Sequence, residues 1–432
     1  MKFNKWTVGL AAVGVISLAS AARADEKMNS LQTALSNTTI SGYVSASFNW
    51  ALSPGGANNG SSPAAFIPFQ GQGAGLFSDE KSPSKQDGFN LDVVKLSISK
   101  PQDESPWASG YQVDLIFGPD AVGYNTSVNA QENNGNTTVA NDYAIKQAYI
   151  ALRTPIGNGI DWKIGVFDTI IGYEVFDAGS NPNYTRSWGY FVEPTEHTGI
   201  LGTYKINDSW SVSAGIANTL SAGINARDNE SGSSPSISNG QGGQGSDWHK
   251  TLMASATFVA PSSWGWAAGS SIYAGMVYGF NAAGVSAPHG GYQSGYQQNY
   301  YLGATMNTPW KQLTTGFAFD YVRNFLGGSD PGKNDVDVYV IGLYATYKAT
   351  DKLSLSGRAE FINGEFTNGG GADRSENGYE LTTTVEYDMW ANVVARVEAR
   401  FDHIHSGSSS TFGFDLEHAD SLGLYANVIY KF

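Results

Sequence analysis

The segment from Asp168 to Thr195 combines opposite charges with aromatic rings, a combination suited to filtering or binding small charged solutes. Its candidates for this chemistry are Tyr173, Glu174, Asp177, Tyr184 and Arg186. Glu174 and Asp177 offer carboxylates, and Arg186 either faces them across a passage or pairs with them. The first arrangement would act on a solute, whereas the second would brace the segment, and the residue types allow both.

A second group of charges falls on alternating positions of segments that read as β-strands. Its members are Asp114, Lys163, Arg358, Glu360, Glu386, Arg396, Glu398 and Arg400. Because the side chains of a strand alternate between two faces, these charges point away from the apolar face. If their face encloses water, they impose an electric field on solutes. The alternative is that they pair across neighbouring strands and stabilise the wall.

Residues typical of enzymes, metal sites and cofactor sites form no convincing pattern. The histidines that could serve a hydrolase, His197, His249, His403 and His405, are dispersed, and no nucleophile-elbow motif occurs. His403 and His405 lack further metal ligands at a suitable spacing. The glycine-rich run from Gly240 to Gly245 lies in a loop rather than between a strand and a helix. We therefore expect no catalysis, no metal and no cofactor.

The last residues of the chain show the kind of element that positions the charges. Leu422, Leu424, Ala426, Val428, Tyr430 and Phe432 fall on one side of an alternating segment. We count about 16 segments of this kind, of which 141–153 and 336–349 alternate poorly. They lie near 39–50, 88–100, 109–118, 141–153, 160–167, 196–206, 209–218, 250–260, 270–280, 299–308, 313–322, 336–349, 352–362, 378–388, 391–402 and 421–432.

Short and long connections alternate between these segments. Asn207–Asp208 and Thr350–Asp351 are short, whereas connections such as Thr219–His249 and Asn363–Asn377 are long and polar. Short turns on one side and long loops on the other are typical of a membrane barrel built of hairpins. The sequence predicts an all-β fold, a transmembrane antiparallel up-and-down β-barrel of about 16 strands (about 14 to 18) in one domain over residues 25–432. Its turns would be periplasmic, its loops extracellular, and its apolar faces would contact outer-membrane lipid.

Tryptophans gather beside the short connections. Trp107, Trp162, Trp210, Trp264, Trp310 and Trp390 belong to this group. An indole is apolar but carries one N–H donor, so a ring of indoles at one level is typical of a membrane interface, where we also place Phe432. A final Phe with apolar residues at every second position upstream resembles the C-terminal recognition signal of bacterial outer-membrane proteins. That resemblance implies that the outer-membrane assembly machinery binds the chain end.

Composition agrees with an exported barrel. Residues 1–24 read as a secretory signal peptide, because Lys2 and Lys5 precede an apolar stretch and Ala22–Arg23–Ala24 fits a cleavage site. The chain has no Cys, and its 25 Lys and Arg stand against 39 Asp and Glu, a net charge of −14 at pH 7. Nucleic acid is therefore not an expected partner, and charge near a pore would favour cations over anions.

Several stretches resemble the OmpL-like β-barrel porin-2 family. They are Lys163–Phe167, Ile171–Asp177, Asn181–Ser187 and His197–Gly199, with Gln147–Tyr149 and Ser41–Val44 also fitting its pattern. Thr185 stands where this pattern has Ser before Arg186, a change that keeps the hydroxyl. The resemblance is strongest over about 140–220 and implies an outer-membrane diffusion channel without a particular substrate. By analogy with general porins, the third long loop, Asp168–Thr195, is expected to fold inward and narrow the pore.

These observations favour a porin in the outer membrane of a Gram-negative-type bacterium. It would be a passive diffusion channel for small hydrophilic solutes or ions, weakly cation-leaning or non-selective. A homotrimer is expected by analogy with porins of this size. The alternative is an outer-membrane adhesin or receptor that binds a partner through its long surface loops. A rim enzyme is disfavoured by the dispersed histidines.

Overall fold

The computed structural model describes residues 37–52, 85, 88–121, 124, 143–220, 224–225, 250–281, 295–324, 334–368, 374–406 and 418–432. The predicted signal peptide and the predicted start of the mature chain lie outside these residues, as do His249, the glycine-rich run Gly240–Gly245 and much of the predicted long loops. Among the described residues, no helix is both long enough and apolar enough to cross a bilayer.

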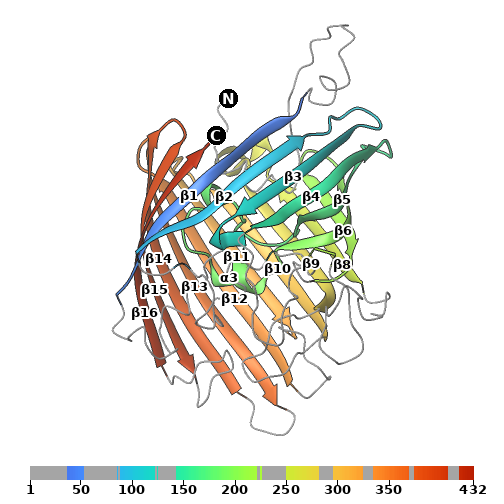
Figure 1. The fold of residues 1–432 in the computed structure, drawn as a ribbon. Coiled ribbons are helices and arrows are strands. Elements are labelled where there is room, and N and C mark those ends of the chain that lie inside the picture. The colour runs from blue at the N-terminus through green and yellow to red at the C-terminus, as the bar shows by residue number, and fades with distance from the viewer. Residues whose placement is uncertain are drawn as a thin grey trace, which may run out of the picture.

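Antiparallel strands close into one barrel (Figure 1). The strands are β1 (Thr39–Ala51), β2 (Gly88–Lys100), β3 (Ser109–Phe117), β4 (Tyr143–Thr154), β5 (Ile160–Asp168), β6 (Glu196–Lys205), β7 (Trp210–Ala217), β8 (Thr251–Val259), β9 (Ser271–Asn281), β10 (Gly295–Asn307), β11 (Leu313–Arg323), β12 (Asn334–Lys348), β13 (Leu353–Asn368), β14 (Arg374–Trp390), β15 (Val393–Ser406) and β16 (His418–Lys431). Each strand pairs with its neighbours in sequence, and β1 pairs with β16. The predicted 16-strand transmembrane barrel is confirmed.

The closing contact involves the last residue of the chain. Phe432 donates its backbone N–H to the carbonyl of Gly42, and Gly42 donates to the carbonyl of Phe432, both at 3.0 Å. The ring of Phe432 covers Gly42, where a Cβ would collide with it. The start of β1 and the end of β16 therefore meet at the end of the barrel that carries the short connections (Figure 1). No strand edge is left open, as a hydrocarbon environment requires.

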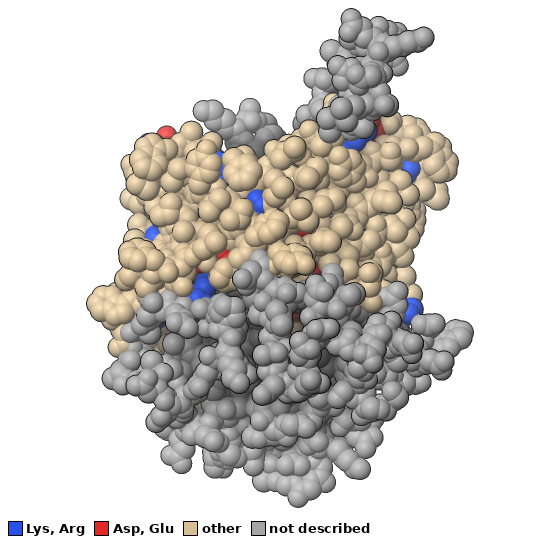
Figure 2. All heavy atoms as spheres, viewed as in Figure 1, with Lys and Arg blue, Asp and Glu red and all other residues tan. Residues whose placement is uncertain are grey.

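The outer face of the barrel is apolar. Side chains such as Leu381, Val397 and Leu343 are 54%, 61% and 56% exposed. Figure 2 shows the strands as a belt with few charged atoms. A contiguous apolar surface of this extent is what lipid selects, so the alternating apolar residues of the sequence face the membrane.

The C-terminal strands run further than the apolar alternation. β13 ends at Asn368 and β14 begins at Arg374, so the predicted long connection 363–377 is reduced to residues 369–373. Asn363 pairs with Asn377 and Glu365 with Ser375 in the same ladder. The prediction failed here because backbone pairing continues beyond the apolar belt, where polar side chains no longer show the alternation.

The buried apolar residues lie inside the barrel, where residues 169–195 pack on the inner wall. We call these residues the lumen segment; they contain the short helices η5 (Ala178–Ser180) and α3 (Trp188–Val192). Two further 3-10 turns, η4 (Pro119–Ala121) and η7 (Ser262–Ala267), lie in other connections. In Figure 1 the green α3 is drawn within the barrel. The predicted inward fold of the third long loop therefore matches the structure of this segment.

Candidate pore constriction

The helix α3 attaches the lumen segment to the barrel wall by apolar packing. Trp188 and Val192 are buried against Val322, Val338 and Val340 of β11 and β12. These valines face the lumen, where water would otherwise meet them, so burial by α3 removes an unfavourable apolar surface. Ser187 caps the helix by accepting the N–H of Tyr190 at 3.0 Å. Other parts of the segment join three more clusters, so it contacts much of the inner wall.

Glu398 of β15 holds the turn of the segment through backbone amides. Its carboxylate accepts the N–H of Tyr184 at 2.6 Å and that of Thr185 at 2.9 Å. The hydroxyls of Thr185 and Thr384 donate to it as well, each at 2.6 Å. The hydroxyl that Thr185 shares with the Ser of the family pattern therefore binds Glu398 and helps to hold the segment. An ionised carboxylate with several donors makes strong hydrogen bonds in a buried site.

Arg358 of β13 joins the segment to the wall. One Nη donates to Glu174 at 2.8 Å and to the carbonyl of Thr185 at 2.8 Å, while Nε donates to Glu380 at 3.1 Å. Glu360, on the same strand, accepts the N–H of Trp188 at 2.7 Å. All these charged side chains are buried. Glu174 thus contacts an arginine and backbone, as in the bracing interpretation of the sequence.

Three further arginines complete the bracing. Arg186 donates to the carbonyl of Phe176 at 2.9 Å, and Arg400 donates to the carbonyl of Arg186 at 2.6 Å. Arg396 donates to the carbonyls of Ala178 and Asn181 at 2.8 and 2.9 Å, and its Nε donates to Glu386 at 2.8 Å. Because the wall arginines Arg358, Arg396 and Arg400 bind backbone carbonyls between residues 178 and 186, they hold the middle of the segment against β13 and β15 rather than leaving it free in the lumen.

A buried carboxyl pair links the segment to β11. Burial raises the pKa of Glu193 well above its ordinary value of 4.5, and the nearby carboxylates of Asp320, Glu174 and Glu360 add to this rise. The Glu193 side chain hydrogen-bonds that of Asp320, a contact between two carboxyl groups that requires a proton. This link is therefore made by an acid and a carboxylate rather than by an ion pair.

Two aspartates with partly exposed side chains lie at the lumen: Asp168, the last residue of β5, and Asp177, within the lumen segment. Lys95 binds Asp177 at 2.7 Å and Asp114 at 3.1 Å, and Lys146 binds Asp168. The side chains of Asp168 and Asp177 are each 41% exposed, whereas those of Lys95 and Lys146 are only 8% and 2% exposed. In both pairs the lysine is hidden and the carboxylate remains accessible.

A polar strip on β3 to β5 lies beside these aspartates. Gln147 donates to Asp114 at 2.9 Å and accepts the N–H of Asp168 at 3.2 Å. Lys163, partly exposed, lies 4.9 Å from the ring centroid of Tyr149. The predicted residues Asp114, Lys163 and Asp177 thus come together here, while Glu174 and Arg186 lie among the braces.

Sequence reasoning did not single out Lys95, Lys146 or Asp168. Register shifts opposite Ser45/Ala46 and Asp114/Leu115 place an extra residue in β2 and in β4. These bulges reverse the alternation within a strand, so Asp92 and Lys95 are both buried inside although they are three positions apart. In the sequence, the break in alternation within 141–153 was the sign of the bulge at Lys146.

The predicted interface tryptophans lie at the short-connection end. Trp107, Trp310 and Trp390 are 73%, 72% and 67% exposed, and Trp210 and Trp264 are exposed as well. Trp162 is less exposed and donates its indole N–H to Thr154 at 3.0 Å. Their contact with lipid headgroups stays a prediction.

No metal site is formed by three or more His, Asp or Glu side chains within the described part of the chain. His403 binds Asp420 at 2.6 Å and stacks on Tyr379. Buried His197 contacts the hydroxyl of Thr169 at 3.1 Å. Both histidines therefore have partners within the barrel wall or beside it.

A closed antiparallel barrel with an inward-folded third loop defines an outer-membrane channel of the porin class. The chain belongs to the OmpL-like beta-barrel porin-2 family, whose profile matches residues 37–432. No curated protein matches it significantly in sequence.

Solved structures of outer-membrane proteins share the fold. The channel DcaP of Acinetobacter baumannii aligns with a TM-score of 0.55 at 12% identity, covering 91% of this chain and 97% of that one. OmpT of Vibrio cholerae gives 0.52 at 12% identity, with 91% and 97% covered. An anion-selective porin from Comamonas acidovorans gives 0.51 at 10% identity, with 91% and 99% covered. At these identities the likeness concerns the fold alone.

Proposed function

We propose that this outer-membrane channel is a passive porin for small hydrophilic solutes with a weak preference for cations. The observation that carries the proposal is the asymmetry of the two ion pairs at the constriction. Asp168 and Asp177 expose carboxylates to the lumen, whereas their partners Lys146 and Lys95 are hidden. A passing ion therefore meets the negative member of each pair first.

The net charge of the buried interior also favours cations. The buried side chains of the described residues include 12 Asp or Glu, of which the Glu193–Asp320 pair holds one proton, and seven Lys or Arg. In a low-dielectric wall such an excess attracts cations to the lumen and discourages anions. The partly exposed Lys163 in the same strip opposes this effect and keeps the preference weak.

The test is single-channel recording in planar bilayers under a KCl gradient. We expect stepwise conductance and a reversal potential of cationic sign. The double variant Asp168→Asn/Asp177→Asn removes both exposed charges and should lower the potassium-to-chloride permeability ratio by up to about fivefold for each charge removed, since an exposed charge contributes about 1 kcal/mol at most.

Asp208→Asn is the matched control, because Asp208 lies on a short turn and pairs there only with the exposed Lys205 among the ion pairs described. Its permeability ratio should equal that of the wild type. Absence of conductance steps would overturn the porin function. A ratio unchanged in the double variant would overturn the role of the two aspartates.

A further inference from the structure

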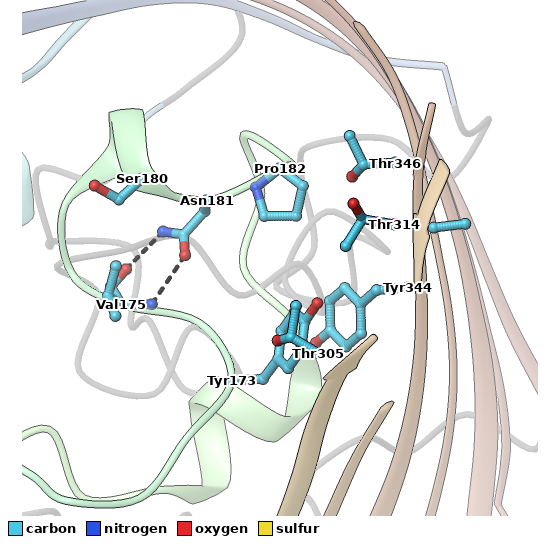
Figure 3. A pocket seen from close by; sticks show the side chains of 10 residues that line it. Tyr173, Val175, Ser180, Asn181, Pro182, Thr305, Thr314, Tyr344 and Thr346 are labelled. Atoms are coloured by element: carbon cyan, nitrogen blue, oxygen red, sulfur yellow. Dashed lines mark hydrogen bonds between the residues drawn. The ribbon is translucent and has the colours of Figure 1, made fainter. Parts of the chain in front are cut away.

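The lumen segment packs closely on the wall of β10 to β12. Tyr173 stacks on Tyr344 with ring centroids 4.0 Å apart, and Asn181 accepts the N–H of Val175 at 2.9 Å (Figure 3). The cavity between segment and wall has a volume of about 40 Å³, which holds a few water molecules but no organic solute. The polar strip of β3 to β5 is different, because it presents charged groups to the lumen.

The polar strip presents a positive charge in Lys163. This residue is the register partner of Leu201, a buried member of an inner-wall cluster, so its side chain faces the lumen. It is partly exposed, and its Nζ lies over the ring of Tyr149, 4.9 Å from the centroid. Among the described residues it forms no ion pair and no hydrogen bond. Contact with an aromatic face holds a cation without neutralising it, so Lys163 can bind an anionic group of a solute.

Two carboxylates lie near this lysine. The side chains of Asp168 and Asp177 remain accessible, whereas their lysine partners are hidden. The charge of Asp168 acts on Lys163 and also on Lys95, which binds Asp177. The lumen surface here therefore offers a positive and a negative group that are within electrostatic range of each other without forming an ion pair.

Opposite charges that face the lumen without pairing favour solutes that carry both signs. A simple cation is attracted by Asp168 and repelled by Lys163, and a simple anion meets the reverse. A neutral solute gains from neither charge. A zwitterion can place its ammonium group at the aspartate and its carboxylate at the lysine, so both contacts are favourable at once.

We infer that the polar strip is a binding subsite for small zwitterions, that is, amino acids. The ammonium group of the solute donates to Asp168 or Asp177, and its carboxylate accepts from Lys163. Gln112, the partly exposed register partner of Tyr149, adds an amide to the same surface. The inference rests on the proposed porin function and adds a solute class to it.

The experiment measures block of the potassium current in planar bilayers by L-alanine and three relatives of similar size. Alaninamide keeps only the ammonium group, lactate keeps only the carboxylate, and lactamide has neither. We expect a saturable block by alanine, with a lower half-blocking concentration than that of each relative, because alanine alone uses both charges of the strip.

Lys163→Gln removes the positive charge of the strip. It should raise the half-blocking concentration of alanine about threefold, since a solvent-exposed ion pair contributes less than about 1 kcal/mol, and should not raise that of alaninamide. Lys163→Arg keeps the charge and should keep the block. Lys205→Gln is the matched control, because Lys205 ends β6 at a short connection, where it is exposed and pairs with Asp208. Its half-blocking concentrations should equal those of the wild type.

The outcomes separate the subsite from the channel. Conducting channels without saturable alanine block, or with a block unchanged in Lys163→Gln, would overturn the subsite and leave the porin function intact. An equal or lower half-blocking concentration for any of the three relatives would overturn the zwitterion class. If no channel conducts, saturation-transfer NMR of alanine with the detergent-folded barrel decides the subsite separately. A signal weakened in Lys163→Gln supports the subsite, and an absent or unchanged signal overturns it.

Discussion

At the scale of single residues, the buried carboxyl pair is the contact most sensitive to pH. Glu193 belongs to the lumen segment, and its pKa is raised by burial and then by Asp320 and neighbouring carboxylates. The folded protein therefore holds a proton that the unfolded chain releases above its ordinary pKa of 4.5. The stability from this proton is complete at lower pH and is lost as pH rises through the raised pKa.

We predict that the thermal midpoint of the detergent-folded barrel falls between about pH 5 and pH 9 and that Glu193→Gln flattens this fall. An amide keeps a hydrogen bond to Asp320 without titrating. Asp120, whose pKa burial raises to about 7, contributes with the same sign and leaves a residual slope in the variant. Scanning calorimetry across this pH range measures the effect. Equal slopes for wild type and Glu193→Gln would contradict the assignment, and Asp208→Asn should behave as wild type.

At the scale of elements, the lumen segment depends on a few anchors in β13 to β15. Glu398 is the anchor with the simplest chemistry, because it accepts two backbone N–H groups of the segment, from Tyr184 and Thr185. The contacts of Arg358 are shared among several carboxylates and are harder to separate. Loss of the Glu398 charge should therefore loosen the segment while sparing the wall.

Glu398→Gln should lower the free energy of unfolding by about 2 kcal/mol, since hydrogen bonds to a charged acceptor contribute about 1.5 to 3 kcal/mol. We also expect larger current fluctuations in the open channel, because the segment lies inside the lumen. Chemical unfolding in detergent and noise analysis of single channels measure the two effects. Glu365→Gln, on β13 beyond the apolar belt, is a control that keeps the segment's contacts. If Glu398→Gln has the current noise and the free energy of unfolding of the wild type, the anchoring role is refuted.

The strands were predictable from sequence, whereas the partners of the charges were not. Alternation located nearly every strand within a few residues, because one side of each strand contacts lipid along its length. It was weak in 336–349 because Val338 and Val340 face inward and are covered by Trp188. It was weak in 141–153 because of the bulge beside Lys146. Pairing between the lumen segment and β13 to β15 depends on closure of the barrel, which no local pattern contains.

At the scale of the whole molecule, closure depends on the last residue. Phe432 contributes two backbone hydrogen bonds to Gly42 and a ring that covers it. The backbone bonds seal the junction of β1 and β16, and the ring lies on the lipid side with 51% exposure. The two contributions can be separated because the ring can be removed without the backbone.

Deletion of Phe432 should lower the thermal midpoint and the yield of folded barrel more than Phe432→Ala does. The deletion removes both hydrogen bonds, at about 1 kcal/mol each, in addition to the ring. Heat-modifiable migration on gels and thermal scans report folded yield and stability. Recognition by the assembly machinery would appear as a loss of assembly in cells for Phe432→Ala despite normal folding in detergent. Equal effects of the two variants in detergent would contradict the role of the backbone bonds.

The lumen segment contacts residues that come much later in the sequence, and this affects how the barrel forms. Glu174 binds a partner 184 positions later and Thr185 one 213 positions later. While the polypeptide is being inserted, these early residues have no arginine or glutamate to receive them, and contacts so distant in sequence form slowly. Refolding should thus proceed in two kinetic phases. A barrel with a wide, leaky bore would close first, and the bore would narrow only when the segment docks on the C-terminal strands.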